Sequence, residues 1–146
     1  MSSTSAATCI MGVWSLERAA FRALLSGVAG LAPVTEAEPT ALSVWEALRE
    51  QPRLVIALVD RWRAEWRDAL GLVRRLSPDT RLLLVVPVAD NGNCTDWNAL
   101  DAHAWLPKTA GADDLAAAVR TQLDGQPPPR STPAELATTP RRELDA

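Results

Sequence analysis

The chain has 146 residues, of which 47% are hydrophobic, and a formal net charge of −3, so it can form one packed domain with tails. The negative charge argues against direct binding of DNA phosphates, because such contacts require a basic face. No apolar run approaches the roughly 20 residues that span a bilayer, and the N-terminal segment lacks the charged region of a secretory signal, so we expect a cytoplasmic protein.

The first half of the chain alternates apolar runs with helical repeats. Residues 1–8 are expected to be a disordered leader. The apolar run Cys9–Val13, which follows directly, is the first predicted strand. Ser15 can cap the next helix, whose core face has i, i+3, i+4, i+7 spacing: Phe21, Leu24, Leu25 and Val28. Ala32–Thr35 is the second predicted strand. The helix after it has one apolar face, which we expect in the core: Ala41, Val44, Trp45 and Leu48.

The second half repeats this alternation. Leu54–Val59 is continuously apolar, as expected for a strand covered on both faces. A helix follows with an apolar face of Ala69, Leu72, Val73 and Leu76. Leu82–Val88 is the fourth predicted strand, and the polar segment Asn91–Asp101 predicts a short or weak helix. Ala104–Leu106 is the fifth strand, and Gly111 can cap the last helix.

Five strands that alternate with helices predict an α/β domain over residues 9–124, with a parallel sheet, right-handed crossovers and helices on both faces. We expect the flavodoxin-like strand order 2-1-3-4-5, although alternation alone also fits other small α/β domains. After this domain the composition changes. Residues 125–134 form a Pro-rich, semi-rigid linker.

The segment Leu106–Leu123, LPKTAGADDLAAAVRTQL, joins a strand that ends in Lys108 to an amphipathic helix. Together with LERAAFRALL at 16–25 and PDTRLLLVV at 78–86, it resembles the receiver domain of a response regulator, a CheY-like domain, of the subfamily that precedes a LuxR-type helix-turn-helix. Residues 135–146 contain TPRRELDA, which resembles the opening of a LuxR-type DNA-binding domain. This tail is either the start of such a domain or a disordered segment.

The resemblance implies a phosphorylation pocket at the carboxyl ends of the strands, and the chain departs from it. Gly12 and Val13 stand where two acidic residues should hold Mg²⁺, which prefers hard oxygen ligands. Val86 replaces the Ser or Thr of the fourth strand. The phosphoacceptor position falls on Leu58 if the count has no gap and on Asp60 if the strand is longer.

Two charged residues of this vestigial pocket have alternative interpretations. Asp60 is either a residual phosphoacceptor or a solvated residue at the start of a loop, and the second interpretation is favoured because the acidic pair is missing. Lys108 either contacts an anion or ligand, or extends from the strand end into solvent, and the second interpretation is again favoured.

Four tryptophans also follow or lie in the strands that border the expected crevice: Trp14, Trp62, Trp66 and Trp105. They form either a site for a small apolar ligand, in which each indole offers area and one N–H donor, or a filling for the vacated pocket. The filling is the simpler interpretation. His103 is the only histidine, and Cys9 and Cys94 form no metal pattern, so we expect no catalytic residues, metal or cofactor.

These observations predict a pseudo-receiver that is not an enzyme: a phosphorylation-independent regulatory domain that controls dimerisation and output of a C-terminal DNA-binding domain. We expect a homodimer, with DNA bound only through that further domain. The candidate dimer face lies on the last helix, alone or together with the first, and its residues are Leu115, Val119, Arg120 and Leu123. The alternatives are a small-molecule sensor with a Trp-lined pocket, a phosphoacceptor that uses Asp60, and a stand-alone protein-interaction module.

Overall fold

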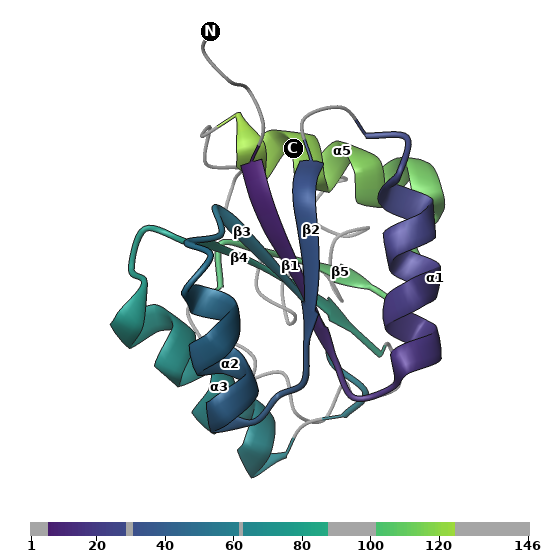
Figure 1. Ribbon diagram of the computed structural model, residues 1–146. Helices are drawn as coiled ribbons and strands as arrows, with labels where there is room; N and C mark the ends of the chain where they lie inside the picture. The colour runs from purple at the N-terminus through teal and green to yellow at the C-terminus, as the bar shows by residue number, and fades with distance from the viewer. Residues whose placement is uncertain (1–5, 29–30, 62, 88–101, 125–146) are drawn as a thin grey trace, which may run out of the picture.

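The computed structural model describes residues 6–28, 31–61, 63–87 and 102–124, in which strands and helices alternate (Figure 1). The strands are β1 (Ala6–Gly12), β2 (Leu31–Ala37), β3 (Leu54–Leu58), β4 (Arg81–Val86) and β5 (Ala104–Pro107). The helices are α1 (Ser15–Leu25), α2 (Ala41–Leu48), α3 (Ala64–Leu76) and α5 (Ala112–Leu123). Within these ranges, no helix is long and apolar enough to cross a membrane.

The five strands form one parallel sheet in the order β2-β1-β3-β4-β5. The predicted flavodoxin-like order is therefore confirmed. Ile10 of β1 is level with Ile56 of β3, which is level with Leu83 of β4. The strand order reverses between β1 and β3, and such a reversal places a crevice outside the carboxyl ends of these two strands.

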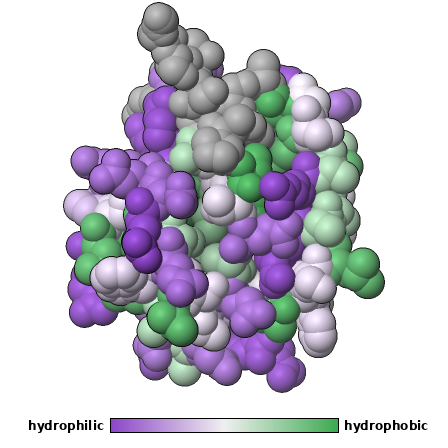
Figure 2. All heavy atoms as spheres, viewed as in Figure 1, coloured by the Kyte–Doolittle hydropathy of each residue, from purple (hydrophilic) through white to green (hydrophobic). Residues whose placement is uncertain are grey.

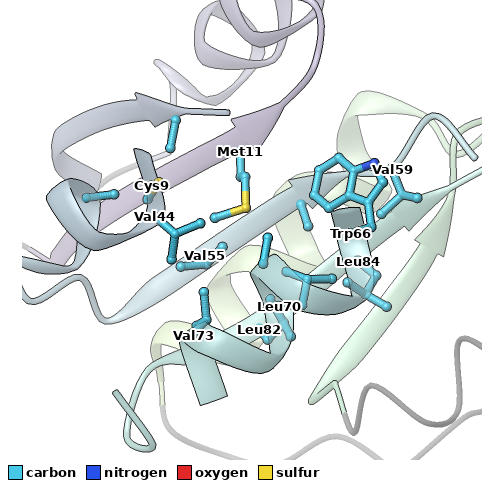
Figure 3. Packing of buried hydrophobic residues seen from close by; sticks show 14 of the residues in the cluster. Cys9, Met11, Val44, Val55, Val59, Trp66, Leu70, Val73, Leu82 and Leu84 are labelled. Carbon is cyan, nitrogen blue, oxygen red and sulfur yellow. The ribbon is translucent and has the colours of Figure 1, made fainter. Parts of the chain in front are cut away.

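The core has two layers, because successive side chains of a strand point to opposite faces of the sheet. On one face, Met11, Val55 and Leu84 pack with Trp66 and Leu70 under α2 and α3 (Figure 3). On the other face, strand residues pack under α1 and α5 in a second buried cluster: Ile10, Ile56, Leu83, Leu25, Leu115 and Val119. Every residue of β3 is buried, which explains why its sequence is continuously apolar.

Several predicted boundaries and faces need correction. β1 begins at Ala6, so residues 6–8 belong to the sheet and not to a leader, because Thr8 is level with Leu54 of β3. Ser15 is the first residue of α1, and the cap position is taken by Trp14 without a side-chain hydrogen bond. Gly111 does occupy the cap position of α5.

Two leucines and one tryptophan that helical spacing assigned to the core are exposed: Leu24, Leu76 and Trp45. The buried face of α2 is centred on Val44 and Ala47, so Trp45 points outward, and its ring lies 5.9 Å from the Arg49 guanidinium. Helical spacing predicted correctly that Val44 of α2 faces the core, but it also assigned the neighbouring Trp45 to that face. The predicted fourth helix in Asn91–Asp101, the linker and the tail lie outside the described residues.

Trp66 of α3 and Trp45 of α2 give a matched pair for a stability test. Trp66 has no exposed surface, whereas Trp45 is 55% exposed. Trp66→Ala should lower the free energy of unfolding by about 3–5 kcal/mol, because it opens a cavity in the core. Trp45→Ala should change it by less than about 1 kcal/mol. Urea denaturation followed by circular dichroism measures both, and equal losses would contradict the two-layer core.

Candidate functional site at the carboxyl edge of the sheet

The predicted pocket residues meet at the carboxyl edge of the sheet. Gly12 at the end of β1 is level with Leu58 at the end of β3. Val86 at the end of β4 is buried, and its carbonyl oxygen accepts a hydrogen bond of 2.8 Å from the backbone N–H of Lys108. Gly12, Leu58 and Val86 carry no polar side chain, so these three positions offer no side-chain ligand for a cation.

Asp60 lies two residues beyond β3, and both of its carboxylate oxygens are occupied. The indole Nε1 of Trp66 donates to Oδ1 at 2.9 Å, and the guanidinium of Arg63 donates to Oδ2. Burial raises the pKa of this carboxyl, but hydrogen bonds from Trp66, from Arg63 and from the backbone N–H of Arg61 lower it by more, so the pKa lies below the ordinary value. The expectation of a solvated loop residue is therefore wrong, because α3 holds the carboxylate against the domain.

Lys108 is paired within the chain. Its Nζ lies 2.8 Å from Oε2 of Glu17 in the first turn of α1, and the two side chains are 24% and 23% exposed. The expectation that this lysine extends into solvent is wrong, because its ammonium group donates a hydrogen bond to the Glu17 carboxylate of α1. The other carboxylate oxygen of Glu17 is buried and has no hydrogen-bond partner among the described residues.

The neighbouring residue of α1 fills the space beside Gly12. The guanidinium of Arg18 donates to the carbonyl oxygen of Gly12 at 2.7 Å and to Oε1 of Glu36 at 3.0 Å. Arg22, one turn later, donates to Oε2 of Glu36 at 3.1 Å. The hydrogen bond from Arg18 is the largest cause that lowers the pKa of the Glu36 carboxyl below its ordinary value; burial opposes it, and Arg22 adds to it.

This packing leaves little room for an acidic side chain at position 12. A Cβ atom on Gly12 would lie 3.3 Å from Cγ of Arg18 and 3.4 Å from Cβ of Leu58. Both distances are tighter than ordinary carbon contacts of 3.5–4.0 Å. An aspartate at this position would therefore require the Arg18 side chain to shift by a few tenths of an ångström to admit its Cβ atom. Across the described part of the chain, no three His, Cys, Asp or Glu side chains gather as a metal-binding group.

The tryptophans do not form the expected ring around Lys108. Trp66 is buried against Asp60, and Trp105 packs with the α2 and α3 layer, whereas Lys108 contacts α1 on the opposite face. Trp14 is exposed, and Trp62 lies outside the described residues. The register explains the result for Trp105: it is level with Leu84, and both side chains pack in the α2 and α3 layer.

Two small cavities open at or near this edge. One, of about 210 Å³, lies between Val13, the turn before α2 and the start of α3. The other, of about 230 Å³, lies between α1 and α5, with Phe21, Leu24 and Lys108 on its wall. No tryptophan lines either one. Both are smaller than the roughly 300 Å³ at which ligand pockets for small molecules usually begin.

The expected dimer face on α5 also needs correction. Leu115 and Val119 are buried against the sheet, so they cannot contact a second copy. Leu123 is partly buried, and its carbonyl oxygen accepts a hydrogen bond of 3.0 Å from Arg53. Of the four candidates only Arg120 is exposed. The apolar spacing of this helix marks its core side and not a contact surface.

Sequence reasoning did not identify four residues that define this edge: Glu17, Arg18, Glu36 and Arg63. One of them carried a usable signal, because Arg63 follows Asp60 at the i, i+3 spacing of a local ion pair. The partners of Glu17 and Arg18 lie 91 and 18 residues away along the chain, so no local pattern indicates them.

Comparison of the structure with solved structures identifies the fold. A LuxR-family two-component response regulator from Aurantimonas sp. SI85-9A1 has a TM-score of 0.71 and 17% identity over 96% of this chain and 99% of that chain. The chain has the fold of a response-regulator receiver domain. A LuxR-family DNA-binding response regulator from Silicibacter pomeroyi gives 0.65 and 24% identity over 82% and 93% of the two chains.

The same fold occurs in the isolated REC domain of RcsB from Salmonella enterica serovar Typhimurium, solved with the phosphomimetic BeF3−, with a TM-score of 0.70 and 12% identity over 84% of this chain and 91% of that one. No protein-family model matches the chain, and no curated protein sequence matches it significantly. At these identities the likeness concerns the fold, and function must be argued from the site.

The ion pairs of Glu36 predict a specific pH dependence. Because its pKa is lowered in the folded state, Glu36 stabilises the fold above the ordinary carboxyl pKa, and this contribution is lost as pH falls towards the folded value. Glu36→Gln should therefore cost about 1 kcal/mol at pH 7 and less at pH 3.

Urea denaturation of the unaltered protein and of Glu36→Gln, at pH 7 and at pH 3, measures the loss of unfolding free energy at each pH. Glu46→Gln is the matched control, because Glu46 is exposed. An equal loss for Glu36→Gln at both pH values would show that the carboxylate charge is not what binds the two arginines.

Proposed function

We propose that this chain is a receiver-like regulatory domain that works without aspartyl phosphorylation. The observation that carries the proposal is that the charged groups of the carboxyl edge are already paired with one another. Asp60 is bound by Arg63 and Trp66, and Lys108 is bound by Glu17. In such a domain, the conformation that regulates output is determined by contacts within the protein and not by a phosphoryl group.

Phosphoryl transfer to an aspartate requires several groups in the same place. A divalent cation must neutralise the phosphoryl oxygens, and the nucleophilic oxygen must approach phosphorus in line with the leaving group. Gly12 and Val13 supply no carboxylate for a cation. Both oxygens of Asp60 accept hydrogen bonds, from Arg63 and from Trp66, which hold the carboxylate in a fixed position and weaken it as a nucleophile.

The lysine pair opposes phosphoryl binding in the same way. A phosphoryl oxygen that binds Lys108 would have to displace the Glu17 carboxylate. That carboxylate lies 2.8 Å from the Lys108 Nζ, and both side chains are partly buried. The displaced carboxylate would then lie close to the incoming anion, and two negative charges at such a distance repel each other. The pairing therefore favours the domain without a bound anion.

The regulatory output follows from the fold likeness and from the tail. Solved structures with this fold include LuxR-family regulators, one of them described as DNA-binding. Residues 135–146 resemble the start of a LuxR-type DNA-binding domain, so we infer that this domain precedes one and sets its dimeric arrangement. Symmetric DNA sites are bound by two-fold dimers, which makes a homodimer the expected state.

The ligand-sensor alternative has less support. The two cavities that the described residues line are small, and no described tryptophan lines them. The buried Trp66 instead fills the layer under α3, where it donates its only N–H group to Asp60. Of the indoles that were expected to offer a hydrogen bond to a ligand, Trp66 is used within the domain. The Nε1 of Trp105 is buried and has no hydrogen-bond partner among the described residues.

Treatment with acetyl phosphate and Mg²⁺ tests the proposal directly. Intact-mass spectrometry should show one unmodified species after the treatment, because Gly12 and Val13 supply no carboxylate for a cation and Asp60 is held by Arg63 and Trp66. Asp60→Asn should give the same result as the unaltered protein. A stoichiometric, hydroxylamine-labile adduct that the Asp60→Asn variant lacks would instead establish Asp60 as a phosphoacceptor and refute the proposal.

A further inference from the structure

Gln122, in the last turn of α5, is a buried polar side chain without a hydrogen-bond partner. It is 2% exposed, and neither its amide nitrogen nor its amide oxygen has a partner among the described residues. The other buried polar residues of the described chain, Thr8 and Thr80, both have partners. Polar side chains otherwise gather at the surface, as the purple residues in Figure 2 show for one face of the molecule. The burial of Gln122 therefore requires a physical reason.

The helical register of α5 explains why this amide is buried. Leu115 and Val119 form the core side of the helix, and Gln122 is the next residue on that side. The adjacent Leu123 lies at the flank of the same core cluster and is only partly buried. Burial of a leucine is favourable, whereas burial of an unpaired amide is costly. The regular helix thus holds the wrong one of these two neighbours in the core.

We propose that the last turn of α5 is a two-state element in which Gln122 and Leu123 exchange places between core and solvent. In the state of this structure, the turn is helical and Gln122 is buried. In the second state the helix ends at Arg120, the Gln122 amide reaches water, and Leu123 packs against the core cluster in its place. This inference rests on the proposed function, because the exchange changes the direction in which residues 125–134 leave the domain towards a DNA-binding domain.

The contacts of the last turn indicate that the two states are close in free energy. The guanidinium of Arg53 donates to the carbonyl oxygen of Leu123 at 3.0 Å, and the backbone N–H of Asp124 donates to that of Arg120 at 2.9 Å. The first of these bonds is exposed, so water competes for its partners. The buried Gln122 amide opposes the helical state, because it has lost its bonds to water without replacement. The last turn of a helix also has few backbone hydrogen bonds to lose.

The last turn of α5 is connected to the middle of the sheet. Arg53 directly precedes β3, and its backbone N–H donates to the carbonyl oxygen of Ala7 in β1 at 2.8 Å. Its guanidinium holds Leu123, so one residue joins the two central strands to the end of α5. Figure 1 shows α5 ending beside the start of β1. A partner that binds one state better than the other shifts the exchange by that difference in affinity.

Relaxation dispersion of backbone amides in the 146-residue chain detects exchange between two such states, which occurs in microseconds to milliseconds. The amides of Thr121, Gln122 and Leu123 should show dispersion. Gln122→Leu should abolish it and should slow hydrogen exchange of these amides at least about tenfold, because the unpaired buried amide is gone. Ala117→Leu adds a leucine at an exposed position of the same helix, and this control should leave the dispersion unchanged.

Two further variants separate the proposed exchange from ordinary fraying of a helix end. Leu123→Ala removes the side chain that replaces Gln122 in the core, so it should reduce the dispersion. Fraying would instead increase when a partly buried leucine is lost. Arg53→Gln removes the hydrogen bond to the Leu123 carbonyl oxygen and should raise the population of the second state severalfold. Circular dichroism of each variant verifies that the domain is folded.

Each outcome has a defined meaning. Absence of dispersion at Thr121, Gln122 and Leu123 in the unaltered chain overturns the two-state element, and so does increased dispersion in Leu123→Ala. A Gln122→Leu variant that is less stable in urea would show that an ordered water satisfies the amide, which also overturns it. An adduct at Asp60 in a chain that shows the exchange overturns the proposed function and leaves the two-state element standing.

Discussion

The ion pairs made by the first turn of α1 determine the arrangement of the candidate site. Glu17 binds Lys108, and Arg18 binds Glu36 and the carbonyl oxygen of Gly12. The pairs are partly buried, so they are screened less by salt than surface pairs. They fix α1 to β5 on one flank and to β2 on the other.

The same fold can therefore support two different electrostatic arrangements at one edge of the sheet. An edge that accepts a phosphoryl group needs acidic ligands for a cation and an unpaired lysine. In this chain the lysine has a carboxylate partner and the space beside Gly12 holds an arginine side chain. The charges are balanced without an added ion, and we propose that regulation acts on association instead. Fold likeness alone could not have distinguished these arrangements.

The strand order and the two core layers could be predicted from the sequence because they depend on strong periodic patterns. Continuous apolar runs such as Leu54–Leu58 report burial on both faces, and this structure confirms that burial. The partners of Lys108 and Asp60 could not be predicted, because side-chain pairing depends on where distant segments meet. Trp45 shows the limit of periodicity: its position fits the apolar stripe of α2, yet Val44 and Ala47 already fill the contact with the sheet.

The central claim is that the charged groups of this edge are paired with one another and do not bind a phosphoryl group. The most direct measurement is a backbone amide NMR spectrum before and after the addition of beryllofluoride with Mg²⁺, which mimics the phosphorylated state. The account predicts unchanged resonances for Gly12, Leu58, Asp60 and Lys108 at saturating reagent. Saturable shifts of these four amides, lost in Asp60→Asn, would show that the edge binds a phosphoryl analogue and would contradict the account.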